Sequence, residues 1–182
     1  LCETHGVEYV IAVPHNIVGP RQKYDDPFRN VMSIMLNRML QGKQPIIYGD
    51  GEQQRCFSDI EDCLFCLKQL AFQNNVVGEI INIGPDEEPV TINKLAEMCA
   101  NETGLNLDPI HHKDRPKEVK LAVCSSDKAR KLLNYKTSTN IRQSVKKTAE
   151  YIRTRGTKKF QYHLPLEIIN DITPDTWKNK LI

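Results

Sequence analysis

The chain has 182 residues, of which 40% are hydrophobic and 26% are charged, and its formal net charge is +2. A chain of this length and composition can bury a substantial core, which argues against intrinsic disorder. Lysine and arginine are spread along the sequence without a dominant charged run, so nothing points to a nucleic-acid or membrane partner. We expect the partner to be a small molecule or another protein subunit.

The sequence contains six cysteines, all within apolar segments. This pattern predicts reduced, buried thiols rather than disulfides. Cys63 and Cys66 form one CxxC, but no second pair lies at the spacing of a zinc site, so we expect no metal. No apolar run approaches the roughly 18 residues that span a bilayer, and residues 1–9 lack the pattern of a secretion signal. We therefore expect a soluble, cytoplasmic protein.

Two β-branched runs predict parallel strands. Residues 7–13, VEYVIAV, form a nearly continuous apolar segment, which is typical of a parallel strand buried on both faces. Such a strand needs neighbours, and only six residues precede it, so we expect the sequence to enter a fold already under way. Residues 79–84, EIINIG, predict the second parallel strand.

The first two helices are predicted from the spacing of apolar residues. Val31, Ile34, Met35 and Met39 recur at helical spacing. They predict a helix with Asp26 and Pro27 as its start signal and Gly42 as its stop. Residues 44–58 predict two short strands around a Gly-Asp-Gly turn. A second helix should cover residues 60–73. Its predicted buried stripe is Ile60, Cys63, Leu64, Leu67 and Ala71.

Three capping residues mark the later helices. Thr91 should cap a helix that ends at Gly104, Ser126 should begin the helix DKARKLL, and Asn140 should cap a long helix that ends near residue 156. A short strand is predicted at residues 108–111 between the first two of these helices. The remaining tail has no clear periodicity, but its aromatic residues indicate packing against a surface.

Three separated segments carry polar residues that a core alone does not require. They are VPHNIVGPRQ (13–22), PIIYGDGEQQRCFSDIED (45–62) and HHKDRPKEV (111–119). An asparagine after a buried strand, an arginine near a tyrosine, and an arginine followed by a glutamate suit recognition of a nucleoside diphosphate. Each segment alone fits a structural interpretation better: a loop-capping asparagine, an exposed arginine with a half-buried tyrosine, and a charged loop.

Taken in this order, the segments resemble the later half of the extended short-chain dehydrogenase/reductase family, specifically its nucleotide-sugar epimerases, dehydratases and decarboxylases. The matching segments are VPHNIVGPRQ, LQGKQPIIYGDGEQQRCFSDIED, IINIG, DRPKEV and SDKARKLLNY, and they cover residues 1 to about 155. Departures from the family pattern include Val13 and Val18, where Arg and Tyr are usual, Lys117 in place of Gly, and Asn134 in place of Gly after the last helix motif.

The resemblance implies roles position by position. Arg55 and Arg115 match arginines that bracket the substrate diphosphate, Glu118 matches a carboxylate on the ribose, and Tyr48 lies where the family places a side chain against the base. Asn16 and Asn30, with Val31, fall at positions that contact the diphosphate or sugar. Pro14 and His15 fall where the backbone passes the nicotinamide of NAD, so they would belong to the cofactor side.

The resemblance also implies a division of the chain. The expected fold class is α/β: the last parallel strands of a Rossmann-type NAD-binding fold, interleaved with a small α+β substrate-binding domain. Residues 1–20 and 57–84 would belong to the dinucleotide-binding sheet, residues 21–56 and 85–156 to the nucleotide-sugar-binding domain, and residues 157–182 would form a C-terminal tail.

The motifs for redox chemistry do not occur in residues 1–182. None of the six tyrosines is followed by a lysine four residues later, and no G-x-x-G-x-x-G or G-x-G-x-x-G is present. We therefore expect no catalytic residues here and interpret the chain as the substrate-binding C-terminal portion of an NAD-dependent NDP-sugar enzyme, acting on a UDP-sugar by transient oxidation.

Two other interpretations stay open. One is a non-catalytic nucleotide-sugar-binding or regulatory module, and the other is a structural or interaction domain without nucleotide affinity. The expected partner is a nucleotide sugar, with a homodimer or a complementary N-terminal chain as further partners. The base, the sugar and the choice among the three reactions stay undetermined from these residues.

Overall fold

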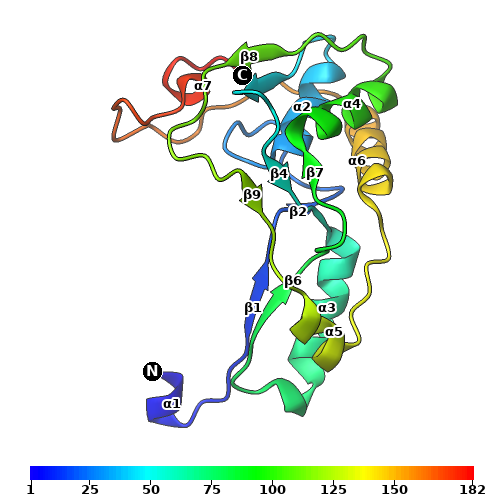
Figure 1. Ribbon diagram of the computed structural model, residues 1–182, viewed down its shortest axis with the longest axis vertical. Coiled ribbons are helices and arrows are strands. Elements are labelled where there is room, and N and C mark those ends of the chain that lie inside the picture. Colours follow the sequence, from blue (N-terminus) through cyan, green and yellow to red (C-terminus); the bar gives the residue numbers. More distant parts are fainter.

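The computed structural model describes residues 1–182 and shows an elongated chain with a strand-and-helix part at one end and a helical part at the other (Figure 1). The helices are α1 (Cys2–His5), α2 (Val31–Met39), α3 (Ile60–Phe72), the 3₁₀ turn η1 (Asn74–Val76), α4 (Ile92–Thr103), α5 (Asp127–Leu133), α6 (Ile141–Arg155) and α7 (Asp175–Lys178). The strands are β1 (Ile11–Pro14), β2 (Ile17–Val18), β3 (Ile46–Tyr48), β4 (Gln54–Arg55), β5 (Ser58–Asp59), β6 (Ile80–Ile83), β7 (Val90–Thr91), β8 (Ile110–His112) and β9 (Leu121–Ala122). No helix combines the length and apolar character that a membrane crossing requires.

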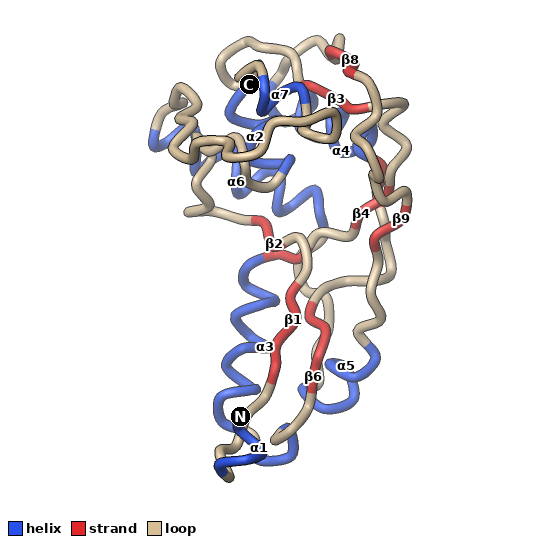
Figure 2. The backbone as a smooth tube through the Cα atoms, turned by 90° about the vertical axis from the view of Figure 1, so that its left-hand side faces the viewer, coloured by secondary structure: helices blue, strands red, loops and turns tan.

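The two predicted long strands are confirmed as a parallel pair. β1 and β6 run side by side with α3 and α5 next to them (Figure 2). The prediction that residues 7–13 form a strand buried on both faces is wrong. The strand begins only at Ile11, and the side chains of Ile11 and Val13 are 44% and 41% exposed. The reason is that β6 is the only strand that pairs with β1, so one edge and one face of β1 lie open.

This open face predicts self-association of the 182-residue chain. Val7 and Ile80 are also exposed on the same segments, and contiguous apolar surface beside an unpaired strand edge favours association. Light scattering after size exclusion should show oligomers, and Ile11→Lys should shift the population toward monomer. Ile168→Lys, which changes an equally apolar but distant exposed residue, should not. A monodisperse monomer of the unmodified chain would contradict this expectation.

The helix after β5 is confirmed, but its predicted buried stripe is wrong apart from Cys63. The buried side chains of α3 are Asp62, Cys63, Cys66 and Leu70, whereas Leu64 is 55% exposed and Leu67 is 41% exposed. Asp62 fixes this rotation, because its carboxylate accepts hydrogen bonds from the backbone N–H groups of Ser138 and Thr139. Burial raises the pKa of the Cys63 thiol to about 12 and that of Cys66 to about 11, so both are neutral core residues.

The buried apolar residues form two clusters. The first joins α2, α4 and α6 through residues such as Leu36, Leu95 and Ala149. The second joins α3 and β6 to α5. Helix α5 thus packs with β6 in the second cluster, although the sequence analysis places α5 in the nucleotide-sugar-binding domain and β6 in the dinucleotide-binding sheet. The division into domains stays a prediction.

Two of the predicted helix caps are confirmed, whereas Ser126 begins α5 without a capping bond, since its hydroxyl donates to the Gly84 carbonyl. Thr91 accepts from the Lys94 N–H at the start of α4, and Asn140 forms a capping box with Gln143 at the start of α6. The predicted start of α2 is wrong. Asn30, not Asp26 with Pro27, is its N-cap, since the Asn30 carboxamide oxygen accepts from the Met32 N–H at 3.0 Å.

The two strands around the Gly-Asp-Gly turn exist, but they do not pair with each other. β3 pairs in parallel with β8, and β4 lies between β7 and β9. The strand predicted at residues 108–111 is shifted to 110–112 for the same reason, because its register is set by β3. Strands linked in parallel through intervening helices make the chain an α/β protein.

Candidate nucleotide-binding site

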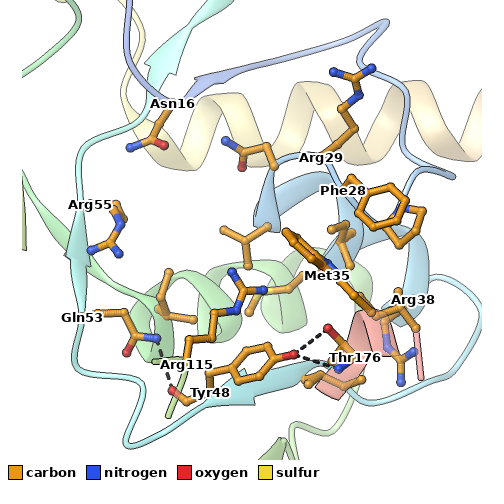
Figure 3. A pocket seen from close by; sticks show the side chains of 18 of the residues that line it. Asn16, Phe28, Arg29, Met35, Arg38, Tyr48, Gln53, Arg55, Arg115 and Thr176 are labelled. Carbon is orange, nitrogen blue, oxygen red and sulfur yellow. Dashed lines mark hydrogen bonds between the residues drawn. The ribbon is translucent and has the colours of Figure 1, made fainter. Parts of the chain in front are cut away.

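A cavity of about 320 Å³ lies at the helical end of the molecule. Its walls come from α2, β3, β4, the loop before β9 and the C-terminal segment (Figure 3). All seven residues that the sequence assigned to the substrate line this cavity. They are Asn16, Asn30, Val31, Tyr48, Arg55, Arg115 and Glu118. The structure therefore brings together side chains that lie more than a hundred residues apart in the sequence, such as Asn16 and Glu118.

Arg55 and Glu118 form an ion pair at one side of the cavity. The Arg55 guanidinium donates to the Glu118 carboxylate at 2.5 Å, and both side chains are largely buried, at 16% and 20% exposure. Arg115 lies in the same turn as Glu118, because the Glu118 N–H donates to the Arg115 carbonyl. Lys117 occupies this turn with φ +59°, which explains why the related motif carries glycine there.

Arg115 lies against Tyr48. Its guanidinium carbon is 4.3 Å from the centroid of the Tyr48 ring and 5.7 Å from that of Trp177. The Tyr48 hydroxyl donates to the Thr176 hydroxyl at 2.5 Å and accepts from the Thr176 N–H (Figure 3). Tyr48 is thus buried, and the guanidinium occupies the ring face that a base would need.

Asn16 lies at the end of β1, where parallel strands present their carboxyl ends to ligands. Its backbone is left-handed, with φ +44°, and its side-chain amide donates to the Cys56 carbonyl at 2.9 Å. Asn16 thus stabilises the loop, which is one of the two roles that the sequence analysis considered for it. Asn16 also borders the cavity near Arg55 (Figure 3), so the two roles are compatible.

Pro14 and His15 do not line this cavity. His15 follows β1, its imidazole Nδ1 is 2.9 Å from the Cys124 sulfur, and its carbonyl accepts from the Ser58 hydroxyl at 2.6 Å. Burial raises the pKa of the Cys124 thiol.

Sequence reasoning missed several cavity residues. Arg38 lies on the same face of α2 as Val31, Ile34 and Met35. This helical spacing could have identified Arg38 as a cavity residue from the sequence. Arg38 is 7% exposed and donates to the carbonyls of Gln44 and Leu181, and burial lowers the pKa of its guanidinium. The other missed residues include Phe28, Arg29, Gln53, Thr176 and Trp177.

The cavity is rich in arginine, although Arg29 pairs with Asp26 and Arg55 pairs with Glu118. Four arginines line it, Arg29, Arg38, Arg55 and Arg115, whereas Glu118 is its only carboxylate. Guanidinium groups in a partly enclosed space favour an anion with several oxygen acceptors, such as a diphosphate. Aromatic and aliphatic side chains lie among these arginines in the cavity wall, and they suit an uncharged planar group.

The parallel strands and the flanking helices define an α/β protein of the Rossmann type, and the cavity is a pocket lined by arginines. Residues 1–84 match the model of the NAD-dependent epimerase/dehydratase family. The resemblance to nucleotide-sugar epimerases is confirmed at the level of similarity, since a curated relative and a solved UDP-glucose 4-epimerase match 84% and 85% of the chain.

Several relatives are similar over most of the chain. A protein of Methanocaldococcus jannaschii is 31% identical over 154 residues, which are 84% of this chain and 48% of the relative. A UDP-glucuronate 4-epimerase of Thermodesulfobacterium geofontis is 28% identical over 153 residues, 81% of this chain and 44% of the relative. The chain thus spans about half the length of the curated relatives it matches.

Solved structures agree with this relationship. The UDP-glucose 4-epimerase of Thermotoga maritima, in complex with UDP-glucose, superposes with a TM-score of 0.77 at 27% identity, covering 85% of this chain and 48% of that one. A UDP-glucuronic acid 4-epimerase of Bacillus cereus, in complex with a UDP-sugar analogue and NAD, gives a TM-score of 0.76 at 28% identity with the same coverage.

Proposed function

We propose that this chain forms the nucleotide-sugar-binding part of an NAD-dependent enzyme that epimerises, dehydrates or decarboxylates an NDP-sugar, with a UDP-sugar as the substrate. The observation that carries the proposal is the convergence of Arg55 and Arg115 on one cavity beside Asn16. Relatives that bind UDP-sugars support the choice of ligand.

In this proposal the diphosphate lies between Arg55 and Arg115. Glu118 now neutralises Arg55, and it would exchange part of that contact for hydrogen bonds to ribose hydroxyl groups. Asn16, Asn30 and Val31 border the diphosphate and the sugar. Because Arg115 covers the Tyr48 ring, the base reaches Tyr48 only after the guanidinium turns toward the phosphates.

NAD would supply the hydride acceptor when bound. The residues of this chain that fit its nicotinamide end are Pro14, the last residue of β1, and His15, which follows it next to Gly84 after β6. An added methyl group at Gly84 would meet the His15 ring, so the two strand ends approach each other closely there. This placement at the carboxyl ends of two parallel strands is typical of dinucleotide sites.

The direct test is a calorimetric titration of the chain with UDP-glucose. The proposal predicts saturable binding at one site, which NAD does not compete for. A structural or interaction domain would show no affinity for UDP-glucose. A non-catalytic binding module would also bind UDP-glucose. The coding sequence upstream of Leu1 distinguishes it from part of an enzyme, because only the enzyme needs a Gly-rich turn and a Tyr-x-x-x-Lys pair there.

The chain of residues 1–182 should bind UDP-sugars without converting them. Proton removal in this chemistry needs a tyrosine activated by a lysine, and this chain has no Tyr-x-x-x-Lys. Incubation with UDP-glucose and NAD, followed by chromatography of the sugar nucleotides, should show no product above the protein-free reaction. Formation of UDP-galactose would show that the chemistry lies within these residues and would overturn this part of the proposal.

A further inference from the structure

The C-terminal segment 157–182 is fastened over the cavity described above. It is tied to the loop before α2 by the hydrogen bond from the Gln161 N–H to the Asp25 carbonyl, and to α2 by reciprocal bonds between Asn37 and the Lys158 backbone. Thr176 is fully buried and hydrogen-bonded to the Tyr48 hydroxyl. This segment lies outside residues 1–155, which carry the sequence resemblance, so the family pattern assigns it no role.

Three residues of the segment, Thr176, Trp177 and Ile182, form part of the cavity wall. The Trp177 ring packs edge-to-face on Phe28, with centroids 5.2 Å apart, and both rings line the cavity. Trp177 also lies 5.7 Å from the Arg115 guanidinium carbon. The segment thus places an aromatic ring next to the cation that the proposed function assigns to the diphosphate.

Two N–H groups at this position lack acceptors. The indole Nε1 of Trp177 and the Nε of Arg115 are both buried and make no hydrogen bond within the protein. A buried donor without an acceptor costs free energy, so such groups are rare unless a ligand or water satisfies them. Both belong to side chains of one cavity, and a nucleotide offers acceptors to both: a base carbonyl and a phosphate oxygen.

We propose that the segment 157–182 is part of the nucleotide site and that Trp177 is a second aromatic side chain, besides Tyr48, that borders the base. This inference rests on the proposed function and adds to it a specificity-determining residue. The cationic groups Arg55 and Arg115 bind the phosphates, and the ring cluster of Trp177 and Phe28 receives the planar base beside them.

Trp177 is the single tryptophan of the sequence, so its fluorescence reports on the proposed contact directly. UDP, which carries a base, should change the emission of Trp177 as it binds. Inorganic pyrophosphate, which lacks the base and ribose, should bind more weakly and leave the emission nearly unchanged. Arg55→Ala should move the UDP titration to higher concentration without removing the emission change at saturation.

Substitution gives a second readout by calorimetry. Trp177→Leu should weaken UDP binding by roughly 5- to 150-fold, the range for loss of one base–aromatic stack, and should leave pyrophosphate affinity within about twofold. Trp177→Phe keeps a ring and should restore most of the UDP affinity. Phe160→Leu alters an aromatic of the same segment that does not line the cavity, and it should have no effect.

The possible failures are distinguishable. If UDP binds but Trp177 emission stays constant and Trp177→Leu binds equally well, the inference is wrong and the proposed function stands. If Trp177→Leu weakens UDP and pyrophosphate alike, Trp177 acts through Arg115 and the contact with the base is refuted. If neither UDP nor pyrophosphate binds the unmodified protein, the proposed function and the inference fall together.

Discussion

Arg115→Ala is expected to weaken UDP-glucose binding by roughly 10- to 150-fold, which corresponds to about 1.5–3 kcal/mol for one charge-assisted contact. The guanidinium lines the cavity, and its Nε has no acceptor in the protein, so it is available for a phosphate oxygen. Its neighbour Glu118 pairs with Arg55, so the substitution leaves no buried carboxylate without a cation. Calorimetric titration measures the change directly.

Arg142→Ala provides the matched control for Arg115→Ala. Arg142 is an exposed arginine on α6, and it does not line the cavity. Removing it changes the net charge by the same amount, so it should reproduce any nonspecific electrostatic effect and little more. Equal losses of affinity in the two variants would show that Arg115 contributes only to the general field, which would contradict its assignment to the diphosphate.

Gly84→Ala is expected to destabilise the fold by about 2–6 kcal/mol, the combined range for backbone strain and overpacking. Gly84 ends β6 with φ +144°, a conformation that L side chains rarely adopt. An added Cβ would clash with the Ser58 hydroxyl and with the His15 ring, and the Ser58 hydroxyl itself donates to the His15 carbonyl. Urea denaturation followed by circular dichroism measures the loss.

Gly78→Ala separates the steric effect from the backbone effect. Gly78 also has a positive φ, at +80°, but nothing lies within 4 Å of a Cβ built there. Its replacement should cost only the left-handed strain of about 1–2 kcal/mol. If both alanine variants lose the same stability, the close approach of His15 to the end of β6 is not a real packing constraint, and the proposed cofactor side would lose its structural support.

Local signals in the sequence predicted most of the elements correctly. The β-branched run before Asn16 and the segment EIINIG gave the parallel pair, and Thr91 and Asn140 gave two helix starts, because capping and periodicity act over a few residues. Asn134 adopts the left-handed conformation expected where the related motif has glycine, with φ +55°.

Features that depend on tertiary contacts were not predictable in the same way. The buried stripe of α3 follows Asp62, whose partner Ser138 lies 76 residues away, so helical periodicity alone placed the stripe on the wrong side. The apparent hairpin around residues 49–51 failed for a related reason, since β3 and β4 find partners that are distant in the sequence.

The candidate site could be assembled from the sequence only as an ordered set of motifs. Arg55, Arg115 and Asn16 were individually ambiguous, and their convergence became visible through the cavity they share. Thr176 and Trp177 could not be predicted, because the tail that carries them has no periodic pattern and is positioned by Tyr48 and Phe28, more than a hundred residues earlier.

The central claim is that Arg55 and Arg115, 60 positions apart in the sequence, hold one diphosphate. A crystal structure of the protein with UDP tests it most directly. We expect both phosphates between the two guanidinium groups, with Asn16 at the border of the same cavity and Arg115 turned away from the Tyr48 ring. A structure in which the diphosphate lies elsewhere, or contacts neither arginine, would contradict this account.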